Sequence, residues 1–263
     1  MTTPDPWTDL RRHTPARLAL GRAGHAVPTE ELLRFGLAHA QARDAVQLAL
    51  DTDALAAELN ATSSHVSQVL HVSSAAPDRA TYLLRPDLGR QLSSADADRL
   101  RRQRPADGCD LLLVVADGLS SQAVARHAAP LVAAIHRQAP AGWTFGPTVI
   151  ATQARVALGD DVGEQLGARL VAVLIGERPG LSAPDSLGIY LTWAPHRGRH
   201  DAERNCISNV RPEGLPPEQA AARLWWLCGA ARDLKLTGVR LKDHSEDALL
   251  ARRGDPLSRL PPA

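Results

Sequence analysis

Residues 111–120 read LLLVVADGLS, an uninterrupted apolar run that ends in a short polar turn. A run without polar alternation is typical of a strand buried on both faces, as in parallel sheets that helices cover on each side. Apolar runs at 148–152, 170–175 and 186–193 predict three further strands, and the segments 121–138, 161–166 and 216–236 predict helices. Residues 61–263 are therefore predicted to form a three-layer, Rossmann-like α/β domain with a mostly parallel sheet.

The N-terminal part of the chain has a different pattern. Residues 1–9 are polar and contain two prolines, which predicts a loose, disordered arm, and residues 9–20 predict a short helix that ends at the following glycines. From Thr29, a candidate N-cap, to about Leu59 the apolar residues recur at helical spacing. Residues 1–60 are therefore predicted to form a small all-helical domain in front of the α/β domain.

The charge balance and the cysteines exclude several classes of protein. Lys plus Arg total 30 against 29 Asp plus Glu, a formal net charge of +1, so no nucleic acid or anionic membrane is expected as a partner. No apolar run approaches the length of a membrane span, and the first residues do not resemble a signal peptide. Three cysteines without Cys-x-x-Cys spacing argue against a disulfide framework and a structural zinc site. A cytoplasmic location is expected.

Unusual residues gather at three places where the sequence predicts strand ends or nearby loops, and open α/β sheets bind ligands at such edges. The three motifs are Asp117-Gly118-Leu119-Ser120, Gly176-Glu177-Arg178-Pro179-Gly180 and the predicted polar loop Asn205-Cys206-Ile207-Ser208-Asn209. Each motif also has a structural interpretation that stays open. The structural interpretation is an ordinary turn capped by Ser120 for the first motif, an ion pair between Glu177 and Arg178 for the second, and an inert cysteine packed in a loop for the third.

Several common cofactor and catalytic motifs are missing from the sequence. It contains no GxGxxG dinucleotide fingerprint and no phosphate-binding P-loop, and Gln122 replaces the second glycine that a serine hydrolase elbow requires. The ten histidines show no metal-ligand spacing. The residues alone therefore predict a polar pocket at the strand ends, without catalytic residues or metal ligands.

Several longer motifs together resemble the small (light) subunit of ethanolamine ammonia-lyase. They extend from about Asp9 to Asp243 and comprise the three motifs above together with Thr14-Pro15-Ala16-Arg17, Gly21-Arg22-Ala23-Gly24 and Tyr82-Leu83-Leu84-Arg85-Pro86-Asp87-Leu88-Gly89-Arg90. The resemblance implies a domain that holds adenosylcobalamin and pairs with a large barrel subunit that binds ethanolamine. It also implies that the corrin lies between the two chains and that radical chemistry of the cofactor yields acetaldehyde and ammonia.

The resemblance also implies which residues contact the cofactor. Val156, Glu177 and Cys206 match positions that contact cobalamin in the family. A corrin is an apolar plate fringed by amides, so Glu177 would accept a hydrogen bond from an amide while Val156 and Cys206 supply contact surface. Asp117 and Ser120 are secondary candidates. The DxHxxG motif, whose histidine replaces the cofactor's own base in other families, is absent, so that base is expected to stay on cobalt.

Two alternatives stay open at this stage. Some relatives carry a long N-terminal extension linked to packaging in a bacterial microcompartment, whereas only about nine residues precede the helical part here. Packaging is therefore left open beside a plain cytoplasmic location. The second alternative is a cobalamin- or nucleotide-binding regulatory module without lyase activity.

Overall fold

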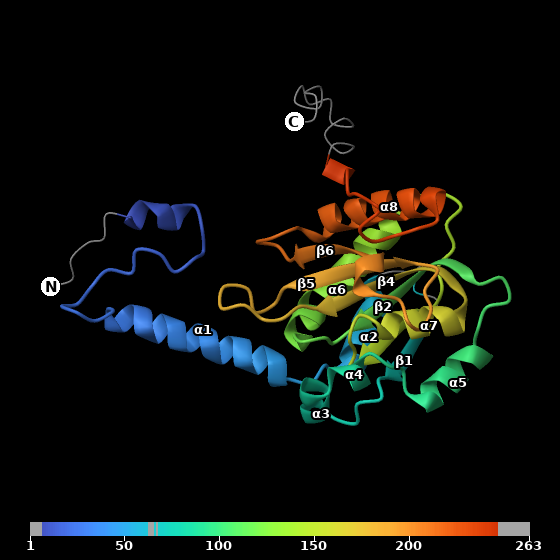
Figure 1. Ribbon diagram of the computed structural model, residues 1–263, viewed down its shortest axis with the longest axis horizontal. Coiled ribbons are helices and arrows are strands. Elements are labelled where there is room, and N and C mark those ends of the chain that lie inside the picture. The colour runs from blue at the N-terminus through green and yellow to red at the C-terminus, as the bar shows by residue number, and fades with distance from the viewer. Residues whose placement is uncertain (1–6, 63–65, 67, 247–263) are drawn as a thin grey trace, which may run out of the picture.

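The computed structural model describes residues 7–62, 66 and 68–246, which form an α/β fold around a six-stranded mixed sheet (Figure 1). The strands are β1 (Val69–Ser73), β2 (Cys109–Ala116), β3 (Thr148–Thr152), β4 (Ala168–Gly176), β5 (Leu187–Trp193) and β6 (Arg204–Val210). They lie in the order β1-β3-β2-β4-β5-β6, and every residue of β2 is buried. Most of the predicted arm 1–9, and the tail from Arg252, lie outside the described residues.

Helices cover both faces of the sheet. They are α1 (Thr29–Gln47), α2 (Thr52–Thr62), α3 (Arg79–Leu84), α4 (Pro86–Gly89), α5 (Ser94–Arg102), α6 (Ser121–Arg137), α7 (Leu158–Leu166) and α8 (Pro217–Leu234), with 3-10 turns η1 (Thr8–Arg12) and η2 (Asp201–Glu203). One core contains side chains of α2, α6 and α8, and the other contains side chains of α5 and α7. Because successive strand residues face opposite sides, β2 contributes Leu113 and Val115 to the first core and Leu112 and Val114 to the second.

The prediction of a mostly parallel sheet is wrong for its last two strands. The neighbours among β1, β2, β3 and β4 pair in parallel, whereas β5 pairs antiparallel with both β4 and β6. A parallel return requires a crossover of about a dozen residues or more, usually a helix. The connections 177–186 and 194–203 contain no α-helix, so the chain turns back each time. β1 also lies at the edge of the sheet, whereas the first strand of a Rossmann fold is central.

The predicted polar loop at Asn205–Asn209 is part of β6. Ile207 is buried in the first core, while the neighbouring Cys206 and Ser208 are exposed. An alternation of this kind is typical of a strand with one covered face and one open face. The polar residues of this segment therefore belong to an edge strand of the sheet.

One region of the second face carries no helix. Successive strand residues face opposite sides of the sheet. Ile189 and Leu191 of β5 and Ile207 of β6 point into the first core, so Tyr190 and Cys206 point to the opposite face. There α7 contacts β2 and β4, and Tyr190 stays half-buried while Cys206 is exposed. We call this surface the open shelf; it is formed by Ile175, Glu177, Gly188, Tyr190, Cys206 and Ser208.

The N-terminal part differs from its prediction in two details. Residues 9–20 hold only the turn η1, because Pro15 disfavours helical conformation at the preceding residue and lacks an N–H donor. Thr29 is the first residue of α1 rather than its N-cap, and Pro28 precedes the helix without a side-chain cap. In α2, Leu55 and Leu59 are buried in the first core. A separate domain at residues 1–60 stays a prediction.

Candidate functional site

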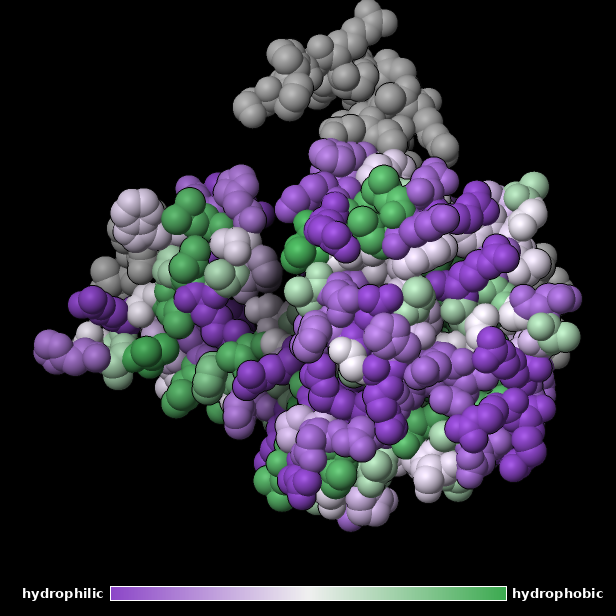
Figure 2. Space-filling view, turned by 45° about the vertical axis from the view of Figure 1, so that its right-hand side comes forward, coloured by the Kyte–Doolittle hydropathy of each residue, from purple (hydrophilic) through white to green (hydrophobic). Residues whose placement is uncertain are grey.

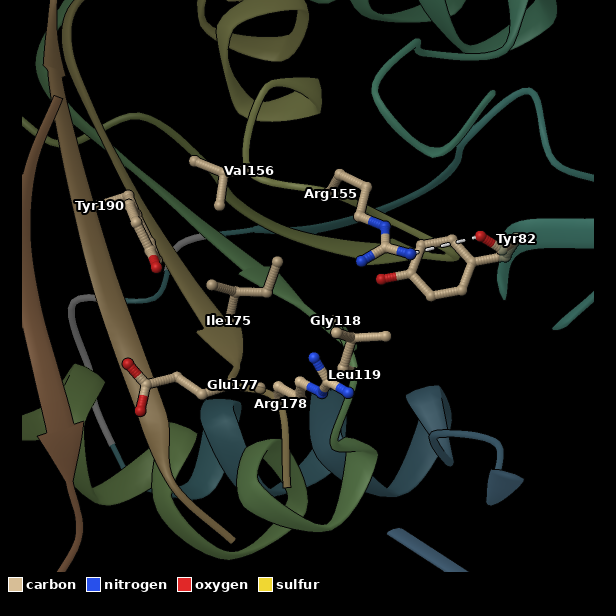
Figure 3. A pocket seen from close by; sticks show the side chains of 10 residues that line it. Tyr82, Gly118, Leu119, Arg155, Val156, Ile175, Glu177, Arg178 and Tyr190 are labelled. Atoms are coloured by element: carbon tan, nitrogen blue, oxygen red, sulfur yellow. Dashed lines mark hydrogen bonds between the residues drawn. The ribbon is translucent and has the colours of Figure 1, made fainter. Parts of the chain in front are cut away.

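An open cavity of about 440 Å³ lies at the carboxyl ends of β2, β3 and β4 (Figure 3). It is lined by Tyr82, Gly118, Leu119, Arg155, Val156, Ile175, Gly176, Glu177, Arg178 and Tyr190. The chain leaves β2 toward α6 on one face of the sheet and leaves β3 toward α7 on the other face. Open α/β sheets bind ligands outside the carboxyl ends of the strands where the connections diverge in this way. The cavity occupies that position.

The turn after β2 forms a rigid wall of the cavity. The Asp117 carboxylate accepts hydrogen bonds from the backbone N–H groups of Gln153 at 2.8 Å and Ala154 at 3.0 Å, which fixes the turn after β3 against it. Gly118 has a φ of +57°, and a Cβ there would lie 2.3 Å from the carbonyl oxygen of Gly176. Glycine is therefore required for the two strand ends to approach one another.

Ser120 has a structural role in the same turn. Its Oγ accepts a hydrogen bond from the N–H of Ala123 at 3.2 Å, which makes it the N-cap of α6, and donates one to the carbonyl oxygen of Pro184 at 2.8 Å. Neither Asp117 nor Ser120 lines the cavity. The structural interpretation of this motif, a turn capped by Ser120, is the one that the geometry fits.

The Glu177 carboxylate is fixed by residues of β6 and of the loop before β5. Ser208 Oγ donates to Oε1 at 2.6 Å, the N–H of Asn209 donates to Oε2 at 3.3 Å, and Ser186 Oγ also donates to Oε2. An ionised carboxylate has about four acceptor positions. One position therefore stays free for a donor that enters the cavity.

Glu177 and Arg178 point in different directions. Figure 3 shows Glu177 on the β5 side of the cavity and the Arg178 guanidinium near Leu119. Within the described part of the chain, no ion pair joins the two side chains. The predicted structural alternative, a turn stabilised by this ion pair, is wrong.

Gly188 makes room for the Glu177 carboxylate. It lies opposite Ile175 in the β4–β5 pairing, and a Cβ built on it would lie 2.9 Å from Glu177 Oε1 and 3.2 Å from its Cγ. Such contacts are too short for an unstrained side chain, so an added methyl group would displace the carboxylate. The position of Glu177 thus depends on a glycine in the adjacent strand.

The turn between β3 and α7 contributes Val156 and Arg155. Val156 is half-buried and presents an apolar side chain to the cavity. The Arg155 guanidinium lies 4.4 Å from the ring centroid of Tyr82, whose hydroxyl donates to the carbonyl oxygen of Ala154 at 3.1 Å. Burial raises the pKa of Tyr82 to about 12, so this hydroxyl stays neutral. Arg155 Nε is buried and has no hydrogen-bond partner among the described residues.

Cys206 lies next to the cavity rather than in its wall. It is directly opposite Tyr190 in the β5–β6 pairing, and Tyr190 lines the cavity. The residue as a whole is exposed, yet partial burial of the thiol against the sheet raises its pKa, so the thiol stays protonated at neutral pH. Val156, Glu177 and Cys206 therefore surround one continuous surface, the cavity and the open shelf.

Sequence reasoning did not identify four of the lining residues as site residues, namely Tyr82, Arg155, Ile175 and Tyr190. A signal for two of them was present, because the chain has only two tyrosines and both line this cavity. Arg155 precedes Val156 directly and carries the unpaired donor.

The residues that the structure describes contain no group of three or more His, Cys, Asp and Glu side chains that could hold a metal ion. In the same part of the chain, no helix is both long enough and apolar enough to span a membrane.

Comparison with known proteins identifies the family. The model of the family described as ethanolamine ammonia-lyase light chain matches residues 4–242. The chain is 55% identical over 251 residues to the ethanolamine ammonia-lyase small subunit of Ralstonia nicotianae, with 94% of this chain and 92% of the relative covered. Small subunits of the same enzyme from Pseudomonas putida strain W619 (54% identity, 93% and 90% covered) and Azotobacter vinelandii (53% identity, 94% and 92% covered) are also similar. These matches confirm the resemblance seen in the motifs. The chain therefore belongs to the ethanolamine ammonia-lyase light chain family, the small subunits of a heteromeric lyase.

Proposed function

We propose that this chain holds adenosylcobalamin on the open shelf, and that a large barrel subunit, which binds ethanolamine, covers the other side of the corrin. The observation that carries the proposal is a sheet surface without helix cover at the ligand-binding edge, bordered by Glu177 on one side and Arg155 on the other. When bound, the cofactor supplies a carbon-centred radical through homolysis of its cobalt–carbon bond. The alternative of a regulatory module without lyase activity has no observation in its favour.

The chemistry of the shelf fits the cofactor. A corrin presents a broad apolar plate, and Val156, Ile175 and Tyr190 provide apolar contact area of that kind. Amides at the rim of a corrin carry both donors and acceptors. The free acceptor position of Glu177 suits an amide N–H, and the Arg155 guanidinium, which lines the cavity, carries donors that suit an amide carbonyl. A buried amide without such partners would cost about 1–3 kcal/mol.

The residues of this chain bind and orient the cofactor in this proposal. Glu177 would hold one amide of the cofactor, and three protein donors already keep its carboxylate in place for that contact. Cys206, as a neutral thiol, supplies a soft contact rather than a nucleophile. The side chains that contact ethanolamine and handle the radical are assigned to the large subunit.

The proposed location is the cytoplasm. All three cysteines of the chain are free thiols, which fits a reducing compartment. Packaging in a bacterial microcompartment stays a prediction.

A variant that fills the shelf tests the proposal. Cys206→Trp adds an indole ring to the exposed face of β6, whereas Asp98→Trp adds the same ring to the exposed side of α5, away from the cavity. Each variant is co-expressed with the large subunit, and cobalamin retained after gel filtration is measured by its absorbance. We expect both complexes to assemble and only the Cys206 variant to lose cobalamin and ammonia release. Normal retention and turnover in that variant would contradict the shelf as the cofactor site.

A further inference from the structure

The N-terminal arm, defined here as residues 7–37, has no core of its own. It consists of η1, the irregular segment after it and the first half of α1, and none of its residues is buried. Ordering a residue costs about 1–2 kcal/mol of conformational entropy, which buried apolar surface normally offsets. Most of the stability of a helix in a protein comes from tertiary packing of one face rather than from helix propensity. The conformation of the arm therefore indicates a covering surface outside this chain.

The first half of α1 carries an apolar stripe that faces solvent. Leu32, Leu33, Phe35 and Leu37 are 62%, 69%, 44% and 61% exposed. Leu33 and Leu37 are one helical turn apart and lie on the same side of the helix, whereas Leu32 and Phe35 form a second pair on another side, where Arg17 and His39 contact the Phe35 ring. Figure 2 shows hydrophobic side chains gathered on the lobe that the N-terminal part forms beside the body of the molecule. A contiguous exposed apolar patch of this kind is typical of a protein–protein contact.

The charged residues beside the stripe are paired within the arm. Glu31 lies 2.9 Å from Arg11 and 3.0 Å from Arg34, and Arg34 also pairs with Glu30. These pairs neutralise Glu30 and Glu31, whereas the Arg17 guanidinium lies 5.7 Å from the centroid of the Phe35 ring. The surface that covers the stripe is therefore expected to be apolar where it meets Leu33 and Leu37, and not basic beside Phe35.

The arm is connected to the loop that begins at Glu177. Arg17 Nη2 donates to the carbonyl oxygen of Leu181 at 3.5 Å, and Ser182 Oγ donates to the carbonyl oxygen of Pro15 at 3.4 Å. Both partners lie in the connection 177–186 between β4 and β5. Figure 1 shows α1 projecting from the same side of the body as that connection. One surface that closes the open shelf would thus also reach the arm.

We propose that Leu33 and Leu37, flanked by Leu32 and Phe35, anchor this chain on the large subunit, and that an apolar surface of that subunit covers them while it closes the shelf. The inference rests on the proposed function of the shelf. A second copy of this chain is the competing occupant. It would cover the stripe but would leave the shelf without the subunit that carries the substrate.

The test compares two double variants of the full chain in complex with the large subunit. Leu33→Glu with Leu37→Glu places charges on the stripe at positions that are 69% and 61% exposed. The control, Leu234→Glu with Val239→Glu, places the same charges at positions that are 57% and 66% exposed, at the end of α8 and beside the start of β6. Circular dichroism and the melting temperature of each small subunit alone check that the fold is retained.

The dissociation constant between the two subunits decides the outcome. We expect it to rise by more than about tenfold for the stripe variant and to change by less than about twofold for the control. Unchanged affinity in the stripe variant would overturn the proposal. The proposal would also be overturned if the isolated chain formed a dimer that the stripe variant disrupts, while the affinity of that variant for the large subunit stays the same. If the wild-type complex assembles but retains no cobalamin, the proposed function is contradicted and the anchor proposal is not. The anchor proposal is tested by the affinity between the two subunits, which does not depend on the cofactor.

Discussion

Glu177→Ala separates the binding role of this residue from its structural role. The substitution removes three hydrogen bonds that the carboxylate accepts from protein donors. Ser208 and Asn209, two of the donors, are exposed and can bond to water instead, so we expect a loss of only about 1–2 kcal/mol of folding free energy. For a chain of this size that corresponds to a decrease of about 2–8 °C in the melting temperature of the apo complex.

The expected effect on the cofactor is larger. If Glu177 accepts from a corrin amide, the variant leaves that amide buried without its acceptor, at a cost of about 1–3 kcal/mol. The dissociation constant for cobalamin should then rise by about 5- to 150-fold. Displacement of neighbouring shelf residues would increase this fold-change further, so a control variant is needed that perturbs the shelf but keeps the Glu177 carboxylate.

Ser208→Ala is that matched control. It removes one of the three donors to Glu177 and keeps the carboxylate and its free acceptor position. The melting temperatures of the apo complexes and the equilibrium dissociation constants for cobalamin are measured for both variants. We expect Ser208→Ala to shift cobalamin affinity by less than about threefold. If Glu177→Ala lowers the melting temperature but leaves cobalamin affinity unchanged, the residue only stabilises the strands and its role in cofactor binding is refuted.

Three further outcomes are expected. Gly188→Ala should displace the Glu177 carboxylate, because the new Cβ would lie 2.9 Å from Oε1, and should weaken cobalamin retention several-fold in the same binding assay. Asp160→Ala should destabilise the chain by about 3–5 kcal/mol in urea unfolding, since it removes the buried carboxylate 2.6 Å from the buried Arg204 guanidinium and leaves that guanidinium only the exposed Asp201 at 4.0 Å as a charged partner. Asp98→Ala, which removes an exposed ion pair, should cost less than about 1 kcal/mol, and equal effects would contradict this reasoning. The purified chain without its partner should release no ammonia from ethanolamine with adenosylcobalamin present, and turnover would contradict its role as a subunit that cannot act alone.

The sequence predicts the parallel core of the fold well. The run at 111–116 and the segment 148–152 correspond to β2 and β3, with β2 extended by two residues at its start. These strands are recognisable because both of their faces are buried, which leaves a continuous apolar signal. β1 escaped prediction because His71 and the serine at its end interrupt that signal. The direction of β5 could not be read from its composition, since it depends on the connection before it.

The residues alone predicted a pocket at the strand ends, whereas Val156 and the common role of Val156, Glu177 and Cys206 were predictable only through the resemblance. Val156 and Glu177 are far apart in sequence and carry no spacing that indicates a common ligand, yet both line one cavity. Their proximity follows from the strand order, which places the ends of β3 and β4 on either side of β2. The sequence around Glu177 also left open an ion pair between this residue and its neighbour Arg178. The structure instead gives it donors from Ser208 and Asn209, which only the antiparallel pairing of β6 brings into reach.

The part of the sheet that was predicted wrongly is also the part that forms the proposed binding surface. A parallel β5 would have needed a helical crossover, and helices of such crossovers pack against the sheet. A helix on this face would bury Tyr190 and Cys206, as α7 buries the corresponding face of β4. The short connections at 177–186 and 194–203 avoid that cover and leave an apolar surface open at the carboxyl edge of the parallel strands. An open surface of this kind suits the proposed arrangement, in which a broad, flat cofactor lies between this chain and the large subunit. The cofactor can then contact both chains, and no helix of this chain has to move aside.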